Sequence, residues 1–121
     1  SMREKLLEGH PNRSEHFDLK HDRGGMIDIE FIVQYLVLAH AHRYSQLTAN
    51  AGNIALLKLA GKLGLIPADA AESVGSAYRE FRRHQHGLRL NGAKYARVPH
   101  EDVNEQTAAT LALWRKVFGK A

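Results

Sequence analysis

The sequence predicts an all-α protein, a four-helix up-and-down bundle with a short extra helix at its N-terminus. Three observations predict this class. The seventeen residues Met26–His42 form an apolar run without glycine or proline. Later segments repeat apolar residues at helical spacing, and glycine or proline separates the segments. Strand is the alternative for the apolar run, but a run this long exceeds the usual length of a strand.

Length and composition independently limit the possible fold and class of function. The 121 residues, 44% of them hydrophobic and 25% charged, fit one globular domain with one core. Cysteine is absent, which excludes disulfides, thiol catalysis and cysteine-ligated metals. Because polar residues interrupt the apolar run, we expect no membrane span. The net charge of +4 is a modest excess that favours anionic partners.

The N-terminal part is expected to lead into the bundle. Ser1, which precedes Met2, is interpreted as a remnant of expression, and Met2–Glu8 is expected to form a short helix. The span His10–Asp22 has no helical period and is predicted to be a loop, with only a weak tendency to pair as a strand. Phe17 and Leu19 alternate within it and could anchor it to the core.

The central helix is predicted over Met26–His42 and carries two apolar stripes. The first stripe comprises Ile29, Ile32, Val33, Leu36 and Ala39, and the second comprises Phe31, Tyr35 and Leu38. A helix that is apolar along two neighbouring stripes is expected to be covered on two sides.

Three further helices follow the central one. The next should end at about Leu63, with Thr48 or Asn50 as its N-terminal cap and Gly64 just past its C-terminus. Another should run from about Ala68 to Leu88 or slightly beyond.

The last helix is expected from about Asp102 to Phe118, after a loop over Ala93–His100. We therefore predict that residues 1–22 are the lead-in and that residues 23–121 form the single bundle domain.

Asp28 and Glu30 are the most suggestive pair of carboxylates. Two residues apart on a helix, their side chains point about 200° apart, so they cannot hold one metal ion together. Spacing alone favours a structural role, with Asp28 complementing the first helical turn and Glu30 on a solvated edge. The preceding Gly24-Gly25 is more simply a backbone turn than a phosphate loop, because no Walker pattern is present.

Histidine is abundant, with eight residues, but it does not predict a metal site. The pairs His40 with His42 and His84 with His86 are each two apart on predicted helices and therefore lie on different faces. We expect no metal bound by this chain.

The run RGGMIDIEFIVQYLVLAHAH, together with MREKLLEG and FDLKHD, resembles the C-terminal part of bacterial glutamine synthetase adenylyltransferases. The resemblance implies a helical bundle of the nucleotidyltransferase substrate-binding type that follows a nucleotidyltransferase domain of the same chain. Such an enzyme transfers AMP from ATP to a tyrosine of glutamine synthetase and removes it in its other half. Magnesium, ATP, glutamine synthetase and the PII signal protein are the implied cofactors and partners, and the implied location is cytoplasmic.

The resemblance also implies roles for residues at the start of the central helix. Arg23, Gly24, Gly25, Asp28 and Glu30 are expected to position the nucleotide or the acceptor protein. Enzymes of this class hold their metal ions with a Gly-Ser followed by an Asp-x-Asp on a strand. The only Gly-Ser here is Gly75-Ser76, inside a predicted helix with no Asp-x-Asp after it. No catalytic residue is therefore assigned, and the chain alone is expected to be inactive.

A different class of function stays open, that of a stand-alone binding module. Arg79, Arg82, Arg83 and Arg89 recur on one side of the third bundle helix and form a candidate basic contact face for nucleic acid or an acidic protein. No aromatic residues that could stack on bases are interleaved with them, so nucleic acid is not the expected partner.

Overall fold

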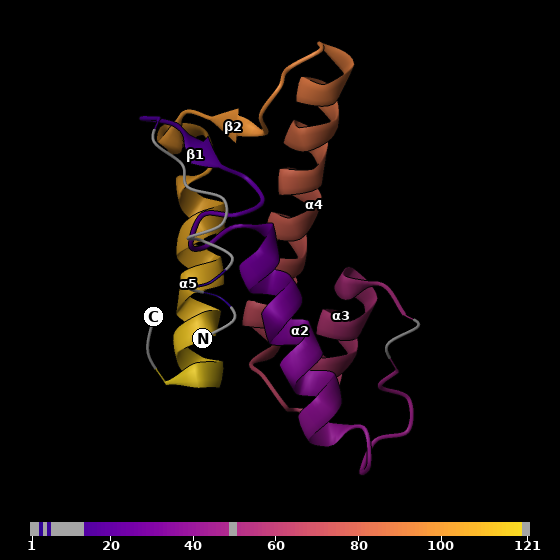
Figure 1. The fold of residues 1–121 in the computed structure, drawn as a ribbon. Helices are drawn as coiled ribbons and strands as arrows, with labels where there is room; N and C mark the ends of the chain where they lie inside the picture. The colour runs from indigo at the N-terminus through magenta and orange to yellow at the C-terminus, as the bar shows by residue number, and fades with distance from the viewer. Residues whose placement is uncertain (1–2, 4, 6–13, 49–50, 120–121) are drawn as a thin grey trace.

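The computed structural model describes residues 3, 5, 14–48 and 51–119. Its helices in chain order are α2 (Met26–His40), α3 (Asn53–Lys62), α4 (Ala68–Leu90) and α5 (Asn104–Phe118) (Figure 1). A two-residue strand precedes α2, and a second one lies between α4 and α5. The predicted all-α bundle is confirmed.

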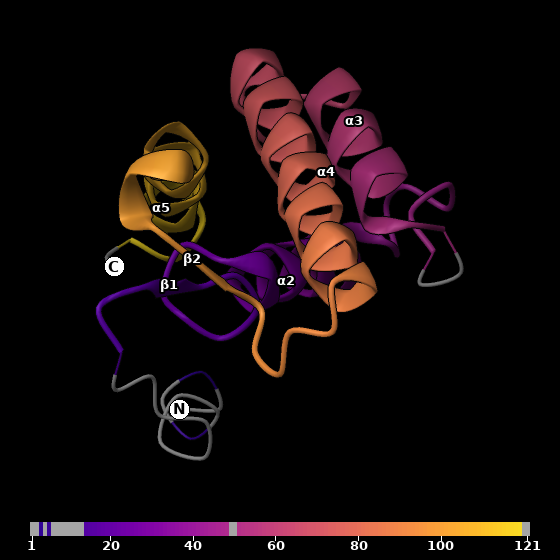
Figure 2. The same cartoon turned by 90° about the horizontal axis from the view of Figure 1, so that it is seen from above.

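The long helix α4 is the centre of the packing. α3 lies along one side of α4 and α5 along the other (Figure 2), and these two contacts are the most extensive in the molecule. α2 contacts all three of these helices. α2 therefore packs against the other helices along one of its faces.

The predicted helix ends need small corrections. α2 ends at His40 because a turn follows at Ala41, two residues before the predicted end. α3 begins at Asn53 after Gly52, and no side chain caps it, so Thr48 is not its cap. Asn50 lies outside the described residues. Gly64 follows the end of α3 with a φ of +76°, the left-handed conformation expected at this place.

The N-terminal helix can be judged at two positions only. Arg3 and Lys5 have helical backbone, and the rest of the predicted Met2–Glu8 helix lies outside the described residues.

Two predicted loops each contain a short strand. Phe17–Asp18 (β1) pairs antiparallel with Arg97–Val98 (β2), with Phe17 opposite Val98. Leu19 N–H extends the ribbon by donating to the carbonyl of Ala96 at 2.8 Å. Phe17 and Leu19 are buried as anchors, as their alternation predicted. Residues 17–19 therefore pack on the bundle core, while the domain boundary at residue 23 stays a prediction.

The start of the last helix is also corrected. A 3₁₀ turn occupies His100–Asp102, and α5 begins only at Asn104. The turn follows Pro99, and Val103, which separates it from α5, has a non-helical φ of −132°.

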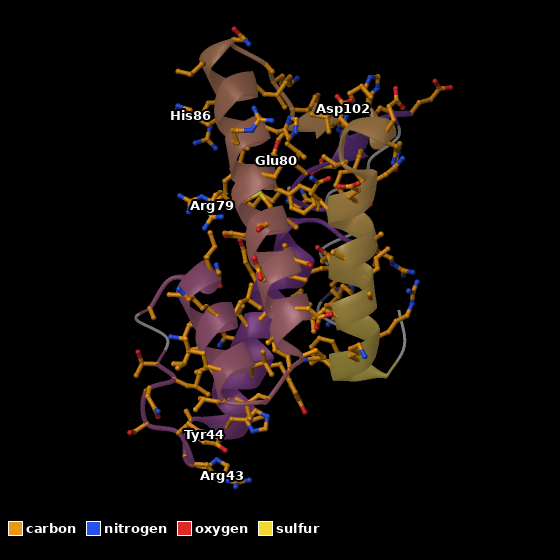
Figure 3. All side chains as sticks on the ribbon, turned by 180° about the vertical axis from the view of Figure 1, so that it is seen from behind. Arg43, Tyr44, Arg79, Glu80, His86 and Asp102 are labelled. Atoms are coloured by element: carbon orange, nitrogen blue, oxygen red, sulfur yellow. The ribbon has the colours of Figure 1, made fainter. Side chains whose placement is uncertain are left out.

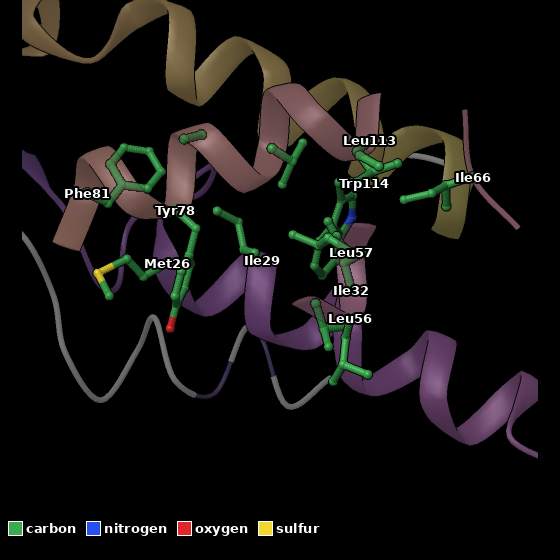
Figure 4. Packing of buried hydrophobic residues seen from close by; sticks show 14 of the residues in the cluster. Met26, Ile29, Ile32, Leu56, Leu57, Ile66, Tyr78, Phe81, Leu113 and Trp114 are labelled. Carbon is green, nitrogen blue, oxygen red and sulfur yellow. The ribbon is translucent and has the colours of Figure 1, made fainter. Parts of the chain in front are cut away.

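One apolar core connects the four helices (Figure 4). Its fully buried large side chains include Ile29 and Ile32 of α2, Leu57 of α3, Phe81 of α4 and Leu113 of α5. Leu56 of α3 is buried as well.

The second apolar stripe of α2 is left largely exposed by the described part of the chain, so the predicted cover on two sides was wrong. Leu38 is 73% exposed and Tyr35 is 44% exposed, while Phe31 is half-buried. Phe118 of α5 contacts Tyr35, with ring centroids 5.1 Å apart. Among the described helices, none is long and apolar enough to cross a membrane.

Candidate functional site

The backbone turn that leads into α2 explains why positions 24 and 25 are both glycine. Gly24 is buried and has a φ of +88°, a conformation that strains any residue with a Cβ. Gly25 is buried too, and a Cβ on it would lie 2.6 Å from the carbonyl oxygen of Leu19. The polypeptide backbone therefore approaches too closely here for any larger residue.

The backbone amides of this turn already have protein acceptors. Gly25 N–H donates to the Asp22 carbonyl at 2.9 Å, Met26 N–H to the Leu19 carbonyl at 2.8 Å, and Ile27 N–H to the Lys20 carbonyl at 3.0 Å. A phosphate loop presents such amides to its ligand instead. The interpretation of Gly24-Gly25 as a backbone turn is the one that these hydrogen bonds favour.

Asp28 is buried, with only 3% of its surface exposed, and is fully engaged. Arg3 donates to both carboxylate oxygens, from Nε at 2.9 Å and from Nη2 at 2.7 Å. Gly24 N–H donates to Oδ2 at 2.7 Å. The guanidinium of Arg3 also lies 3.8 Å from the centroid of the Trp114 ring, in cation–π contact. Asp28 thus ties the N-terminal segment, the glycine turn and α5 together.

Glu30 points to a different side of α2 and is half-buried. The Tyr78 hydroxyl of α4 donates to its Oε2 at 2.9 Å, and Asn53 Nδ2 of α3 donates to that same hydroxyl at 3.2 Å. Burial raises the pKa of Tyr78 above its usual value of 10.0, and the bond to the Glu30 carboxylate raises it further. Glu30 is therefore anchored where α2, α3 and α4 meet.

The structure brings only some of the five predicted site residues together. Gly24 N–H bonds to Asp28, whereas Glu30 bonds to Tyr78 of α4 on another side of α2. The two carboxylates diverge, as their spacing predicted. No group of three or more histidines or acidic residues that could hold a metal occurs among the described residues. Arg23 is exposed beside the turn. A role of these residues toward a nucleotide stays a prediction.

A second feature lies on the far side of α4. Arg79, Arg82, Arg83 and Arg89 are all exposed, and with His86, Gln85 and Ile54 they line an open groove of about 410 Å³. Figure 3 shows Arg79 and His86 projecting from this side of α4. We call this feature the basic groove.

Charge pairing within the basic groove is limited. Arg83 pairs with Glu80, and this contact lowers the pKa of the Glu80 carboxyl. His84 Nε2 also lies 3.5 Å from that carboxylate. Because only this carboxylate pairs with the groove's arginines in the described part of the chain, the groove keeps an excess of positive charge.

Sequence reasoning missed Arg3, Tyr78 and Asn53 as partners of the motif. Arg3 lies in a short segment with no unusual composition, and its partner is 25 residues away. Tyr78 lies in α4, and nothing in the sequence pattern shows that its hydroxyl reaches Glu30, 48 residues away.

The fold and the turn before α2 define a small all-α bundle domain in which two buried glycines lead into helix α2. The chain belongs to the family described as GlnD PII-uridylyltransferase, whose model matches residues 1–115. It is 57% identical over 118 residues to the bifunctional glutamine synthetase adenylyltransferase/adenylyl-removing enzyme of Burkholderia mallei, covering 98% of this chain and 13% of that protein.

Similar relatives with the same name occur in other organisms. Identity is 59% over 119 residues in Ralstonia nicotianae, covering 98% of this chain and 12% of that protein. In Nitrosomonas europaea the identity is 54% over 132 residues, covering 98% of this chain and 14% of that protein. The chain therefore spans only about an eighth of the length of these relatives.

Proposed function

We propose that this chain is the C-terminal helical domain of a glutamine synthetase adenylyltransferase. The observation that carries the proposal is the identity of 54–59% over nearly the whole chain to enzymes of that name. In the proposed enzyme, a nucleotidyltransferase domain of the same polypeptide binds ATP and magnesium and transfers AMP to a tyrosine of glutamine synthetase. Removal of AMP belongs to the other half, the PII signal protein is a regulatory partner, and the enzyme acts in the cytoplasm.

The proposed role of this domain is to position groups rather than to perform the chemical step. The sequence has no Asp-x-Asp after a Gly-Ser, so the metal-binding carboxylates must come from the other domain. Within the described residues, Glu30 accepts one hydrogen bond, on Oε2, and its side chain is only half-buried. A carboxylate held in this way can orient a cation, a ribose hydroxyl or a basic side chain during transfer.

The test is the substitution Glu30→Gln in the full-length enzyme. We expect the adenylylation rate to fall by about tenfold or more, equivalent to about 1.4 kcal/mol of transition-state stabilisation. The melting temperature should stay almost unchanged, because a glutamine oxygen can still accept the Tyr78 hydrogen bond. Full activity of Glu30→Gln at both limiting and saturating ATP would show that the carboxylate is structural only.

A companion experiment uses the 121-residue chain alone. It should not label glutamine synthetase with AMP in the presence of ATP and magnesium, whereas the full-length enzyme should. Labelling by the isolated chain would contradict the assignment of catalysis to another domain.

A further inference from the structure

The second half of α4 extends beyond the end of its neighbour α3. α4 has 23 residues and α3 has 10, and the two helices are joined by a short connection (Figure 1). The first residues of α3 meet the middle of α4, where Asn53 Nδ2 donates to Tyr78 at 3.2 Å. Ile54 also lies there, close to Gly75. From Arg79 onward, α4 therefore runs past α3 and borders the basic groove.

The groove has a regular spacing of charge. Arg79, Arg83 and His86 follow one another at intervals of one helical turn, about 5.4 Å, with Arg82 and Arg89 beside them. Ile54, which is half-buried, lines the groove at its α3 end. Leu90 follows the lining residue Arg89 in the last turn of α4 and is 73% exposed.

We propose that the basic groove binds an acidic amphipathic helix of a separate partner protein, laid along α4 in continuation of α3. A helix that carries one acidic residue per turn repeats at the same interval of about 5.4 Å as the arginines. An extended strand presents same-side residues about 6.6–6.8 Å apart and loses this register. Arginine is suited to such contacts because its guanidinium binds carboxylates with two parallel hydrogen bonds.

The polar character of the groove favours a separate and transient partner. Its arginines are exposed, and charges at an exposed interface act mainly on the rate and specificity of association. Permanently covered interfaces are more apolar than this groove. This inference goes beyond the proposed function, because that function assigns no role to the basic groove.

The groove fits an acidic helix better than nucleic acid. None of its lining residues is a tyrosine, phenylalanine or tryptophan that could stack on bases. Glu80 lies next to Arg83, and Glu72 lines the adjoining cavity that shares Arg79 and Ile54 with the groove. Carboxylates repel any anion, but DNA carries about one negative charge per 1.7 Å of its axis, whereas a helix with one acidic residue per turn carries one per about 5.4 Å. The repulsion therefore weighs more against a phosphate backbone than against the acidic helix.

The experiment measures the fluorescence anisotropy of labelled peptides mixed with the 121-residue chain. The probe is a capped helical peptide of about 16 residues with one glutamate per turn and a leucine at each end. A peptide of the same composition but without that spacing is the first comparison, and a short DNA duplex is the second. We expect the spaced peptide to bind more tightly than either.

The decisive variant is the pair Arg79→Gln and Arg82→Gln, which removes two charges from the groove. Its matched control is Arg115→Gln with Lys116→Gln, two exposed cations on α5. We expect the groove variant to weaken binding by about tenfold and the control to change it by less than about twofold. Arg89→Gln is a second groove variant, and circular dichroism melting verifies that every variant is folded.

Several results would overturn the proposal. These are the absence of peptide binding, equal losses in the groove and control variants, equal affinity for the two peptides, and tighter binding of the duplex. The last result would identify a nucleic-acid surface instead.

Discussion

Two carboxylates of α2, only two residues apart, are in opposite situations. Asp28 is buried and accepts three hydrogen bonds from Arg3 and Gly24. Glu30 is half-buried and accepts one, from Tyr78. The helical geometry that separates them by about 200° places one against the N-terminal segment and the other against α3 and α4. One short motif therefore contains a carboxylate whose two oxygens are both paired within the fold and a carboxylate that, among the described residues, keeps one oxygen available to another partner.

The energetic contrast follows from burial. Removing one partner of a buried ion pair leaves an uncompensated charge, at a cost of about 3–5 kcal/mol. Changing a half-buried group that water can reach costs far less. Substitutions at four positions test this contrast.

Asp28→Ala should lower the free energy of unfolding by about 3–5 kcal/mol, because Arg3 and the Gly24 amide lose their acceptor. Urea unfolding of the 121-residue chain measures it, and Glu30→Ala is the matched control. A loss of unfolding free energy below about 1 kcal/mol would show that water replaces Asp28 as the hydrogen-bond acceptor of Arg3.

Gly25→Ala should cost about 1–3 kcal/mol, because its Cβ would lie 2.6 Å from one backbone oxygen and 2.9 Å from another. Gly87→Ala is the matched control. Gly87 lies inside α4 with nothing within 4 Å of an added Cβ, so alanine there should stabilise the protein by about 0.5–1 kcal/mol. The contrast fails if both substitutions have the same sign in thermal or urea unfolding.

Tyr78→Phe should cost about 1 kcal/mol at neutral pH through the loss of its hydrogen bonds to Glu30 and Asn53. The raised pKa of Tyr78 means that the unfolded chain loses the proton before the folded one does. Above pH 10 the wild-type protein should therefore lose the stability that this hydroxyl provides. Urea unfolding between pH 8 and 11 should show the difference between wild type and Tyr78→Phe shrinking as pH rises, and a constant difference would contradict it.

Glu30→Gln should change the free energy of unfolding by less than about 0.5 kcal/mol, because the amide oxygen keeps the Tyr78 bond. The measurement is the same urea titration as for Asp28→Ala. A loss comparable to that of Asp28→Ala would remove the distinction between the two carboxylates.

The sequence predicted the elements that depend on local periodicity. The helices α2, α3, α4 and α5 and the left-handed Gly64 follow from apolar spacing and from glycine or proline at the breaks. The divergence of Asp28 and Glu30 also follows from helical geometry alone.

Contacts between distant segments could not be predicted in this way. Periodicity describes which side of a helix is apolar, but it does not say what lies against that side. The pairing of Arg3 with Asp28 and the exposure of Leu38 depend on where other segments lie in space. The pairing of β1 with β2 could not be predicted either, because two residues per strand carry no recognisable period.

The β1–β2 ribbon has a consequence for the order of folding. Its strands lie about 80 residues apart in the chain, and each has only two residues, too few for independent stability. The helices must therefore bring β1 and β2 together before the ribbon can form. Leu19, which continues the ribbon through Ala96, also supplies the carbonyl that accepts from Met26 at the start of α2. We thus expect the glycine turn to be among the last parts to become ordered as the chain folds.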